Sequence, residues 1–113
     1  MNIKYLKMRK YYCSLHLTMD LIGNKWKTLI LFHLLNGAKR SGVLQKEVEG
    51  VSNKMFTQAL RELEKDKLLI RTVHPVVPPH VDYELSELGM SLEPTLKAMD
   101  GWGKGLMALN DKL

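Results

Sequence analysis

Five polar side chains between residues 53 and 61 are of the types that contact DNA bases, and their spacing places them on one face of a predicted helix. They are Asn53, Lys54, Thr57, Gln58 and Arg61. The amide of Asn or Gln can form two hydrogen bonds with adenine, the methyl group of Thr can touch that of thymine, and Lys or Arg can bind guanine or phosphate. This pattern predicts a surface that fits the major groove of duplex DNA.

The helix that carries this face is predicted to span residues 53–66. Its other face is apolar, which indicates packing against a core; the apolar residues are Met55, Phe56, Ala59, Leu60 and Leu63. Ser52 precedes the helix, where its hydroxyl can accept a hydrogen bond from the backbone N–H of Lys54 or Met55. Because the first amides of a helix also point toward a phosphate at its end, Ser52 belongs to the predicted DNA-binding set.

The segment before this helix predicts the first half of a helix-turn-helix. Leu44 and Val48 lie four residues apart on a short helix that stops at Gly50. The short polar segment at residues 38–42 is expected to form a minor strand, and its Arg40 is a predicted phosphate contact.

The segment after the helix, residues 68–86, predicts a β-hairpin, or wing. Residues 68–74 and 81–85 have the composition of strands. Three prolines lie between them, where a missing amide donor does least harm: Pro75, Pro78 and Pro79. We expect Arg71 and His80 to contact phosphate. A helix followed by a two-stranded hairpin is the order of a winged helix-turn-helix.

Three further helices complete the predicted fold. Residues 15–22 should form a short and mostly buried helix, and residues 25–36 a central one. A last helix is expected over residues 87–113, capped by Ser86, with Pro94 either kinking it or marking its true start. The fold class is therefore mainly α with a small antiparallel β-hairpin.

The length and charge of the chain suit one small DNA-binding domain. We predict a basic N-terminal arm at residues 1–12 and a single winged helix-turn-helix domain at residues 13–113. The net charge of +5 is uneven: residues 1–46 carry nine Lys/Arg and one acid, whereas residues 47–113 carry eight Lys/Arg and eleven acids. A basic half favours a polyanionic partner, although such a surplus also serves solubility.

The composition indicates a cytoplasmic protein that makes no use of a membrane. No apolar run approaches the ~18 residues of a membrane span, and the N-terminus lacks the apolar region of a secretory signal. A single cysteine excludes an internal disulfide, as expected in a reducing compartment.

The predicted last helix has an apolar seam that is a candidate dimer interface. Its residues are Leu92, Leu96, Met99, Trp102 and Leu106. The alternative is that Trp102 with Met99 and Leu106 covers the core of its own chain. We favour the dimer because two half-sites ~34–36 Å apart require a two-fold partner.

Cys13 and the histidines are the remaining candidates for chemistry. Cys13 follows two basic residues and precedes a helix, and both features favour a reactive thiolate; the alternative is a small buried hydrophobe. We predict no metal site and no cofactor. Two pairs, His16 with Asp20 and His74 with His80, each lack a third ligand at a recognisable spacing.

Several linked motifs closely resemble the HxlR family of bacterial transcriptional regulators, winged-helix proteins related to the MarR group. The matching segments are Ile22–Trp26, Gly50–Glu64 and Pro78–Ser86, and Gly89, Leu92, Pro94, Leu96, Trp102 and Gly103 also match. Cys13 stands where these proteins usually carry a cysteine. The family's usual glycine in the turn after the recognition helix is Lys67 here.

The resemblance implies a homodimer that binds an inverted-repeat operator, with its terminal helices forming the interface. It also implies a small-molecule or oxidant effector, because some relatives sense electrophiles through this cysteine. Our reading is a sequence-specific double-stranded DNA-binding transcriptional regulator. The alternative is a winged-helix protein–protein interaction module without DNA binding. An enzyme is disfavoured, since the chain lacks a Gly-rich phosphate loop, a nucleophile elbow and a metal-ligand set.

Overall fold

The computed structural model describes residues 13–111, so the predicted basic arm at residues 1–12 lies outside the described residues. The elements follow in the order α1 (Ser14–Ile22), α2 (Lys25–His33), the 3-10 turn η2 (Leu34–Asn36), β1 (Lys39–Arg40), α3 (Ser41–Glu47), α4 (Asn53–Lys65), β2 (Leu69–His74), β3 (His80–Leu85), α5 (Glu87–Met90) and α6 (Glu93–Asp111). This order confirms a mainly helical fold with a small antiparallel sheet.

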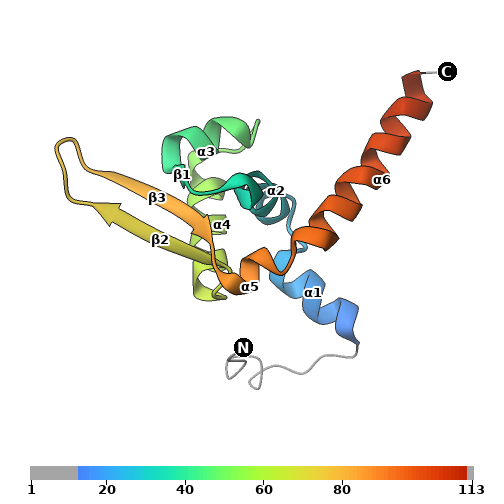
Figure 1. The fold of residues 1–113 in the computed structure, drawn as a ribbon, viewed down its shortest axis with the longest axis horizontal. Helices are drawn as coiled ribbons and strands as arrows, with labels where there is room; N and C mark the ends of the chain where they lie inside the picture. The colour runs from blue at the N-terminus through green and yellow to red at the C-terminus, as the bar shows by residue number, and fades with distance from the viewer. Residues whose placement is uncertain (1–12, 112–113) are drawn as a thin grey trace.

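The sheet has the strand order β1-β3-β2, and both pairings are antiparallel. The β2–β3 hairpin begins with Leu69 opposite Leu85 and closes with His74 opposite His80. The predicted minor strand is confirmed as β1, which pairs with the other side of β3. The hairpin projects from one side of the helical body and α6 from the other (Figure 1).

The core lies around α2 and α4, which confirms the central place predicted for α2. Ile30, Leu31 and Leu34 are fully buried, and so is Leu63 on α4. α2 packs against α3, α4 and α6. Burying each such side chain stabilises the fold by roughly 1.5–3 kcal/mol. The same packing fixes the direction in which α4 presents its polar face.

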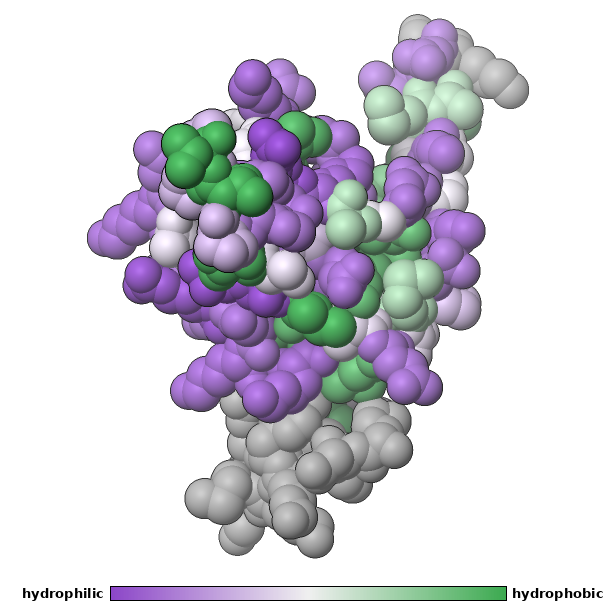
Figure 2. All heavy atoms as spheres, turned by 60° about the vertical axis from the view of Figure 1, so that its left-hand side comes forward, coloured by the Kyte–Doolittle hydropathy of each residue, from purple (hydrophilic) through white to green (hydrophobic). Residues whose placement is uncertain are grey.

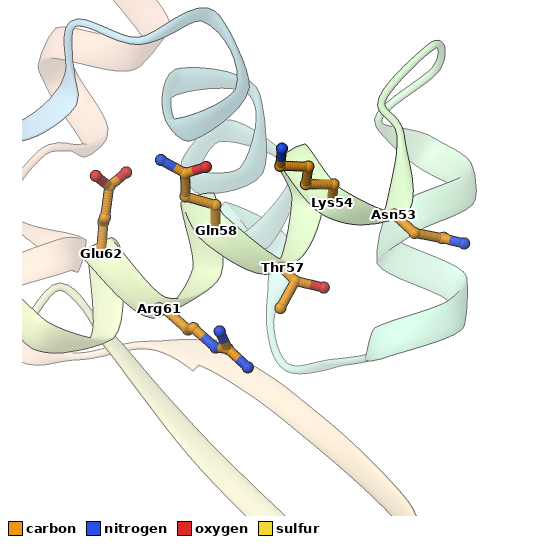
Figure 3. Close-up of a pocket in the computed structure, with 6 residues that line it drawn as sticks. All are labelled: Asn53, Lys54, Thr57, Gln58, Arg61 and Glu62. Carbon is orange, nitrogen blue, oxygen red and sulfur yellow. The ribbon is translucent and has the colours of Figure 1, made fainter.

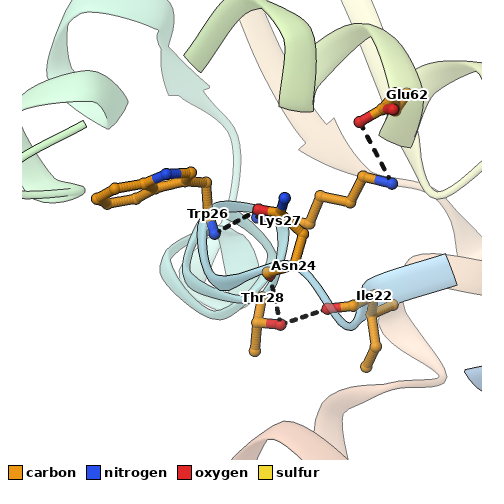
Figure 4. A network of polar contacts seen from close by, with 6 residues as sticks. All are labelled: Ile22, Asn24, Trp26, Lys27, Thr28 and Glu62. Atoms are coloured by element: carbon orange, nitrogen blue, oxygen red, sulfur yellow. Dashed lines mark hydrogen bonds and ion pairs between the residues drawn. The ribbon is translucent and has the colours of Figure 1, made fainter. Parts of the chain in front are cut away.

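A polar network fixes the turn between α1 and α2 and joins α2 to α4 (Figure 4). The Asn24 side chain caps α2 by accepting a hydrogen bond from the Trp26 N–H at 2.8 Å. The Thr28 hydroxyl donates to the carbonyls of Ile22 and Asn24. Lys27, which is buried, places its Nζ 3.4 Å from Glu62 on α4. The second half of α4 is thus held to α2 by an ion pair.

The prediction that α1 is mostly buried is wrong for the single chain. Of its residues only Ile22 is buried, while Leu15 is 65% exposed and Met19 is also exposed. The apolar pattern correctly indicated a helix, but no other described element of this chain covers its outer side. Pattern alone cannot distinguish a face buried within one chain from a face left for a partner.

The segment predicted as one last helix is two helices. Ser86 caps only the short α5, where its Oγ accepts a hydrogen bond from the Gly89 N–H at 3.0 Å. Gly89 is buried, and a Cβ added there would lie 2.3 Å from the Leu68 carbonyl oxygen, so α5 approaches the start of β2 closely. Pro94 is the second residue of α6, where its missing N–H has no partner to lose. Of the two predicted roles for Pro94, the start of the helix is the one observed.

The turn after α4 forms without a glycine. Lys67 has φ +65°, the Leu68 N–H donates to the Leu63 carbonyl, and the Lys67 N–H donates to the Glu64 carbonyl, both at 3.0 Å. These two bonds define a Schellman cap, which normally places Gly at the position of Lys67. A side chain in this left-handed conformation costs roughly 1–2 kcal/mol.

We therefore expect Lys67→Gly to stabilise the protein. Glycine removes the strain of the left-handed conformation, but it loses more conformational entropy on folding than lysine does. We expect the first effect to exceed the second by about 0.5–1 kcal/mol in the free energy of unfolding. Urea denaturation measures the gain. Lys65→Gly is the matched control, since the same replacement at the last residue of α4, where φ is not positive, should lower stability by up to about 1 kcal/mol. If both variants were destabilised, the positive φ at residue 67 would not be a source of strain.

Candidate nucleic-acid interface

The polar face of α4 is presented to solvent as predicted. Asn53, Lys54, Thr57, Gln58 and Arg61 are all exposed, while Phe56, Ala59, Leu60 and Leu63 on the opposite face are buried. Together with Glu62 the five polar residues line a shallow open hollow of about 580 Å³, and their side chains project from successive turns of the helix (Figure 3). The structure therefore gathers these five predicted residues on one surface.

The start of α4 is shaped by a turn and a cap. Gly50 has φ +90°, a conformation that side chains rarely adopt, and it reverses the chain between α3 and α4. The Ser52 hydroxyl then accepts a hydrogen bond from the Met55 N–H at 3.1 Å, one of the two donors predicted for it. This bond helps to orient the first turn of α4, and a DNA contact by Ser52 stays a prediction.

Asn53 is tied to the neighbouring helix, a contact that the sequence did not reveal. The side-chain amide N–H of Gln45 on α3 donates a hydrogen bond to the side-chain oxygen Oδ1 of Asn53. A bidentate contact with adenine uses both the side-chain oxygen and the amino group of Asn53, and this oxygen keeps a second lone pair while it accepts from Gln45. The Gln45 bond therefore orients the Asn53 amide without occupying its amino group. Gln45 could have been suspected only from the place of α3 beside α4.

Charges on α4 are arranged so that its N-terminal half favours a polyanion. No acid occurs between Asn53 and Arg61, whereas Glu62 begins the acidic half. Glu62 is paired with Lys27, which compensates part of its charge. The N-terminal half of α4, which would enter the groove, therefore presents the cationic side chains of Lys54 and Arg61. Neither side chain takes part in an ion pair described for this region.

The two predicted wing contacts lie on opposite faces of the hairpin. Side chains alternate along a strand, so Arg71, paired with Tyr83, shares the face of buried Leu69 and Leu85. His80 points to the other face. There it stacks on His74 with ring centroids 4.5 Å apart and lies 3.9 Å from Asp82. One DNA backbone running along the hairpin would meet Arg71 or His80, but not both from the same side.

Arg40 stands apart from α4, at the junction of β1 and α3. Its backbone is extended and occupies the cap position of α3, and its side chain is exposed. Neighbouring Lys39 is paired with Glu47 at 2.7 Å, which leaves Arg40 as the cation that this junction presents. It remains a predicted phosphate contact.

The predicted dimer seam divides into a buried and an exposed part. Leu96 is only 2% exposed, and Leu92, which directly precedes α6, packs against the core, so both residues hold α6 to its own chain. By contrast, Trp102 is 74% exposed, and Met99 and Leu106 are also exposed. These three do not cover the core of their own chain. Figure 2 shows hydrophobic residues along this helix among polar ones.

Cys13 is exposed at the start of α1. Its backbone occupies the cap position, and its carbonyl accepts a hydrogen bond from the Leu17 N–H. Exposure contradicts the interpretation of this cysteine as a small buried hydrophobe. The basic residues that were expected to favour its thiolate lie outside the described residues.

One grouping of ionisable residues was not anticipated from the sequence. His74 and His80 meet across the hairpin as predicted, and Asp82 joins them. The sequence does not identify Asp82 as a third ligand, because its place beside His74 depends on the pairing register of the strands. None of the helices in the described part of the chain is long and apolar enough to cross a bilayer.

The fold and the exposed α4 define a winged helix-turn-helix protein. The model of the HxlR-like helix-turn-helix family matches residues 21–111, and the chain belongs to this family. An uncharacterized HTH-type transcriptional regulator of Bacillus subtilis (strain 168), YtcD, is 46% identical over 98 residues, covering 87% of this chain and 78% of that protein. The names of YtcD and of the similar solved structures describe regulators, and we describe this protein as a transcriptional regulator with a helix-turn-helix domain.

Solved structures agree with this assignment. The redox regulator HypR in its oxidized form superposes with a TM-score of 0.79 at 39% identity, covering 82% of this chain and 96% of that one. The reduced form of the transcriptional regulator YodB from B. subtilis gives a TM-score of 0.69 at 31% identity, covering 81% of this chain and 91% of that one.

Proposed function

We propose that this protein is a homodimer that binds an inverted-repeat operator in double-stranded DNA and thereby regulates transcription. The observation that carries the proposal is the exposed face of α4, whose base-contacting side chains are free of acids up to Arg61. In this arrangement α4 lies in the major groove, and Arg40 and Arg71 contact phosphates on either side. Because the relative YtcD is a protein of the bacterium Bacillus subtilis, the cytoplasm is the compartment in which we expect this protein to meet DNA.

Apolar side chains that are exposed in the single chain support the proposal of a dimer. Met99, Trp102 and Leu106 on α6, and Leu15 and Met19 on α1, are all exposed. Aromatic and Met side chains are enriched at protein interfaces relative to the rest of the surface. A two-fold arrangement through α1 and α6 would leave both copies of α4 free for successive major grooves.

Two variants of α4 separate base recognition from backbone attraction. We expect Lys54→Ala to weaken binding to all duplexes about equally and to lower the slope of log K against log salt by about 0.9. Gln58→Ala should cost roughly 1–3 kcal/mol on the preferred sequence and relax the preference at one base pair. Fluorescence anisotropy with a selected duplex and a scrambled duplex measures both.

The same titration tests the proposal as a whole. Glu64→Ala, on an exposed position in the acidic half of α4, is the control that should leave sequence preference intact. Equal affinity for the selected and scrambled duplexes, with no loss on raising salt, would contradict DNA recognition and favour a protein-interaction module instead.

We further propose that oxidation at Cys13 regulates this binding. The thiol is exposed, and the redox regulator HypR is among the similar structures. A diamide or quinone pulse should change operator affinity of the unaltered chain, because a disulfide formed between Cys13 and another thiol would constrain the start of α1 next to the proposed interface. Cys13→Ser should abolish the response. An unchanged response in Cys13→Ser rules out a sensing role for this cysteine.

A further inference from the structure

A cluster at the outer end of the hairpin, formed by His74, His80 and Asp82, has the composition of a metal site. The Asp82 Oδ2 lies 2.9 Å from the His74 Nε2, and its Oδ1 lies 3.9 Å from the His80 Nε2. One ligand atom from each of the three residues lies within 4.8 Å of the other two. These contacts bring two imidazoles onto one carboxylate.

The pairing register of the hairpin holds the cluster together. His74 lies directly opposite His80, and Asp82 lies two residues further along β3, opposite Thr72. Because side chains on a strand alternate between faces, His80 and Asp82 share one face, and their partners place His74 on the same face. The cluster therefore rests on the backbone pairing of two strands rather than on a flexible loop.

The donors and their spacing suit a borderline divalent ion such as Zn²⁺. Imidazole nitrogen and carboxylate oxygen bind Zn²⁺ at ~2.0–2.2 Å, so neighbouring ligand atoms of a tetrahedral site lie roughly 3.3 Å apart. The observed separations of 2.9 and 3.9 Å lie on either side of that value. Small side-chain rotations would equalise them. The carboxylate would orient the ligand set and supply its negative charge.

The cluster is only partly buried, so an ion and a fourth ligand can approach it from solvent. The side chains are 39%, 24% and 31% exposed for His74, His80 and Asp82. Each is thus partly held by protein and still open to solvent on one side. Three protein ligands with one open position are the pattern of a zinc site that keeps a bound water.

Two neighbouring charges bear on this site. Glu84 lies on the same face two residues beyond Asp82, and Arg40 of β1 lies opposite Asp82. The positive charge of Arg40 disfavours the binding of a metal cation at the cluster, whereas the negative charge of Glu84 favours it. Ion pairs of His74 and His80 with Asp82 without any metal are the competing interpretation, and metal titration distinguishes the two.

We propose that His74, His80 and Asp82 bind one divalent transition-metal ion of the Zn²⁺ type. The ion cross-links β2 and β3 next to the Pro-rich loop and adds positive charge to a hairpin that is poor in it. A cross-link at this position would restrict the wing without altering α4. This site is independent of whether the protein recognises DNA, so either proposal can fail alone.

Calorimetric titration of the full chain with Zn²⁺ tests the site. A Cys13→Ser background removes thiol binding, and no DNA is present. We expect one ion per chain, and at least a tenfold loss of affinity in both His74→Gln and Asp82→Asn. His33→Gln is the matched control, because His33 also lies near a carboxylate, 3.6 Å from Glu47, but has no second histidine beside it in the described contacts. Its affinity should equal that of the background.

Unchanged stoichiometry and affinity in His74→Gln would overturn the proposal. Nitrogen NMR of the imidazoles in the otherwise unaltered chain gives a result that does not depend on how the variants fold. Addition of Zn²⁺ should shift the Nε2 signals of His74 and His80 and leave those of His33 in place. Shifts confined to other histidines, or no shift at all, would equally overturn it.

Discussion

Trp102→Glu is expected to convert the proposed dimer into a monomer and to abolish operator binding at concentrations where the unaltered chain is saturated. Trp102 is 74% exposed in the single chain, and in a two-fold interface it occurs twice. If each copy contributes about 2 kcal/mol as an interface hot spot, their loss weakens the dimer by roughly a thousandfold. Sedimentation equilibrium measures the dimer, and anisotropy on the same samples measures DNA binding.

The control for this variant is Ala108→Glu, which introduces the same charge into α6. Residue 108 lies on the far side of the helix from Met99 and is also exposed. The control should remain dimeric, and circular dichroism should show both variants folded. A folded Trp102→Glu protein that is still dimeric would place the interface elsewhere.

Leu96→Ala should have the largest effect on stability. Leu96 is the one buried residue of α6, and it belongs to the core that includes α2 and α4. A Leu→Ala replacement at such a site costs roughly 3–5 kcal/mol, a large part of the ~5–15 kcal/mol that stabilises a small domain. Operator affinity should fall as well, since α6 would lose its attachment to the body that carries α4.

Thermal unfolding measures this effect, with an expected fall of at least roughly 10 °C in Tm. Val77→Ala is the control. Val77 lies at the tip of the hairpin and is 99% exposed, so its truncation should change stability by less than about 0.5 kcal/mol. A similar, small effect in both variants would show that α6 is not anchored through Leu96.

The local pattern of the chain was enough to predict α4 and its two faces. Alternation of polar and apolar residues at helical spacing identified the buried Leu60 and Leu63 as well as the exposed Lys54 and Gln58. Ser52 was recognised from its type and position, and its cap is confirmed. Lys67 was expected to sit in a turn that normally requires glycine, and its positive φ bears this out.

Features that depend on distant parts of the chain could not be predicted in the same way. The pattern of α1 predicted a helix, but not that Leu15 and Met19 would be exposed. Leu96 and Trp102 belong to one apolar seam, yet only the packing of α6 against α2 shows that the first is buried and the second is not. The position of Asp82 beside the two histidines follows from the strand register, which the local sequence pattern does not determine.

Selection of genomic fragments by the purified full chain, followed by sequencing of the retained DNA, tests the central proposal most directly. Two copies of α4 related by a two-fold axis should retain fragments that share two inverted half-sites with centres about one helical turn, or a multiple of it, apart. Retained DNA with no shared sequence beyond that of random competitor, or with a single unpaired half-site, would contradict a dimeric DNA-binding regulator.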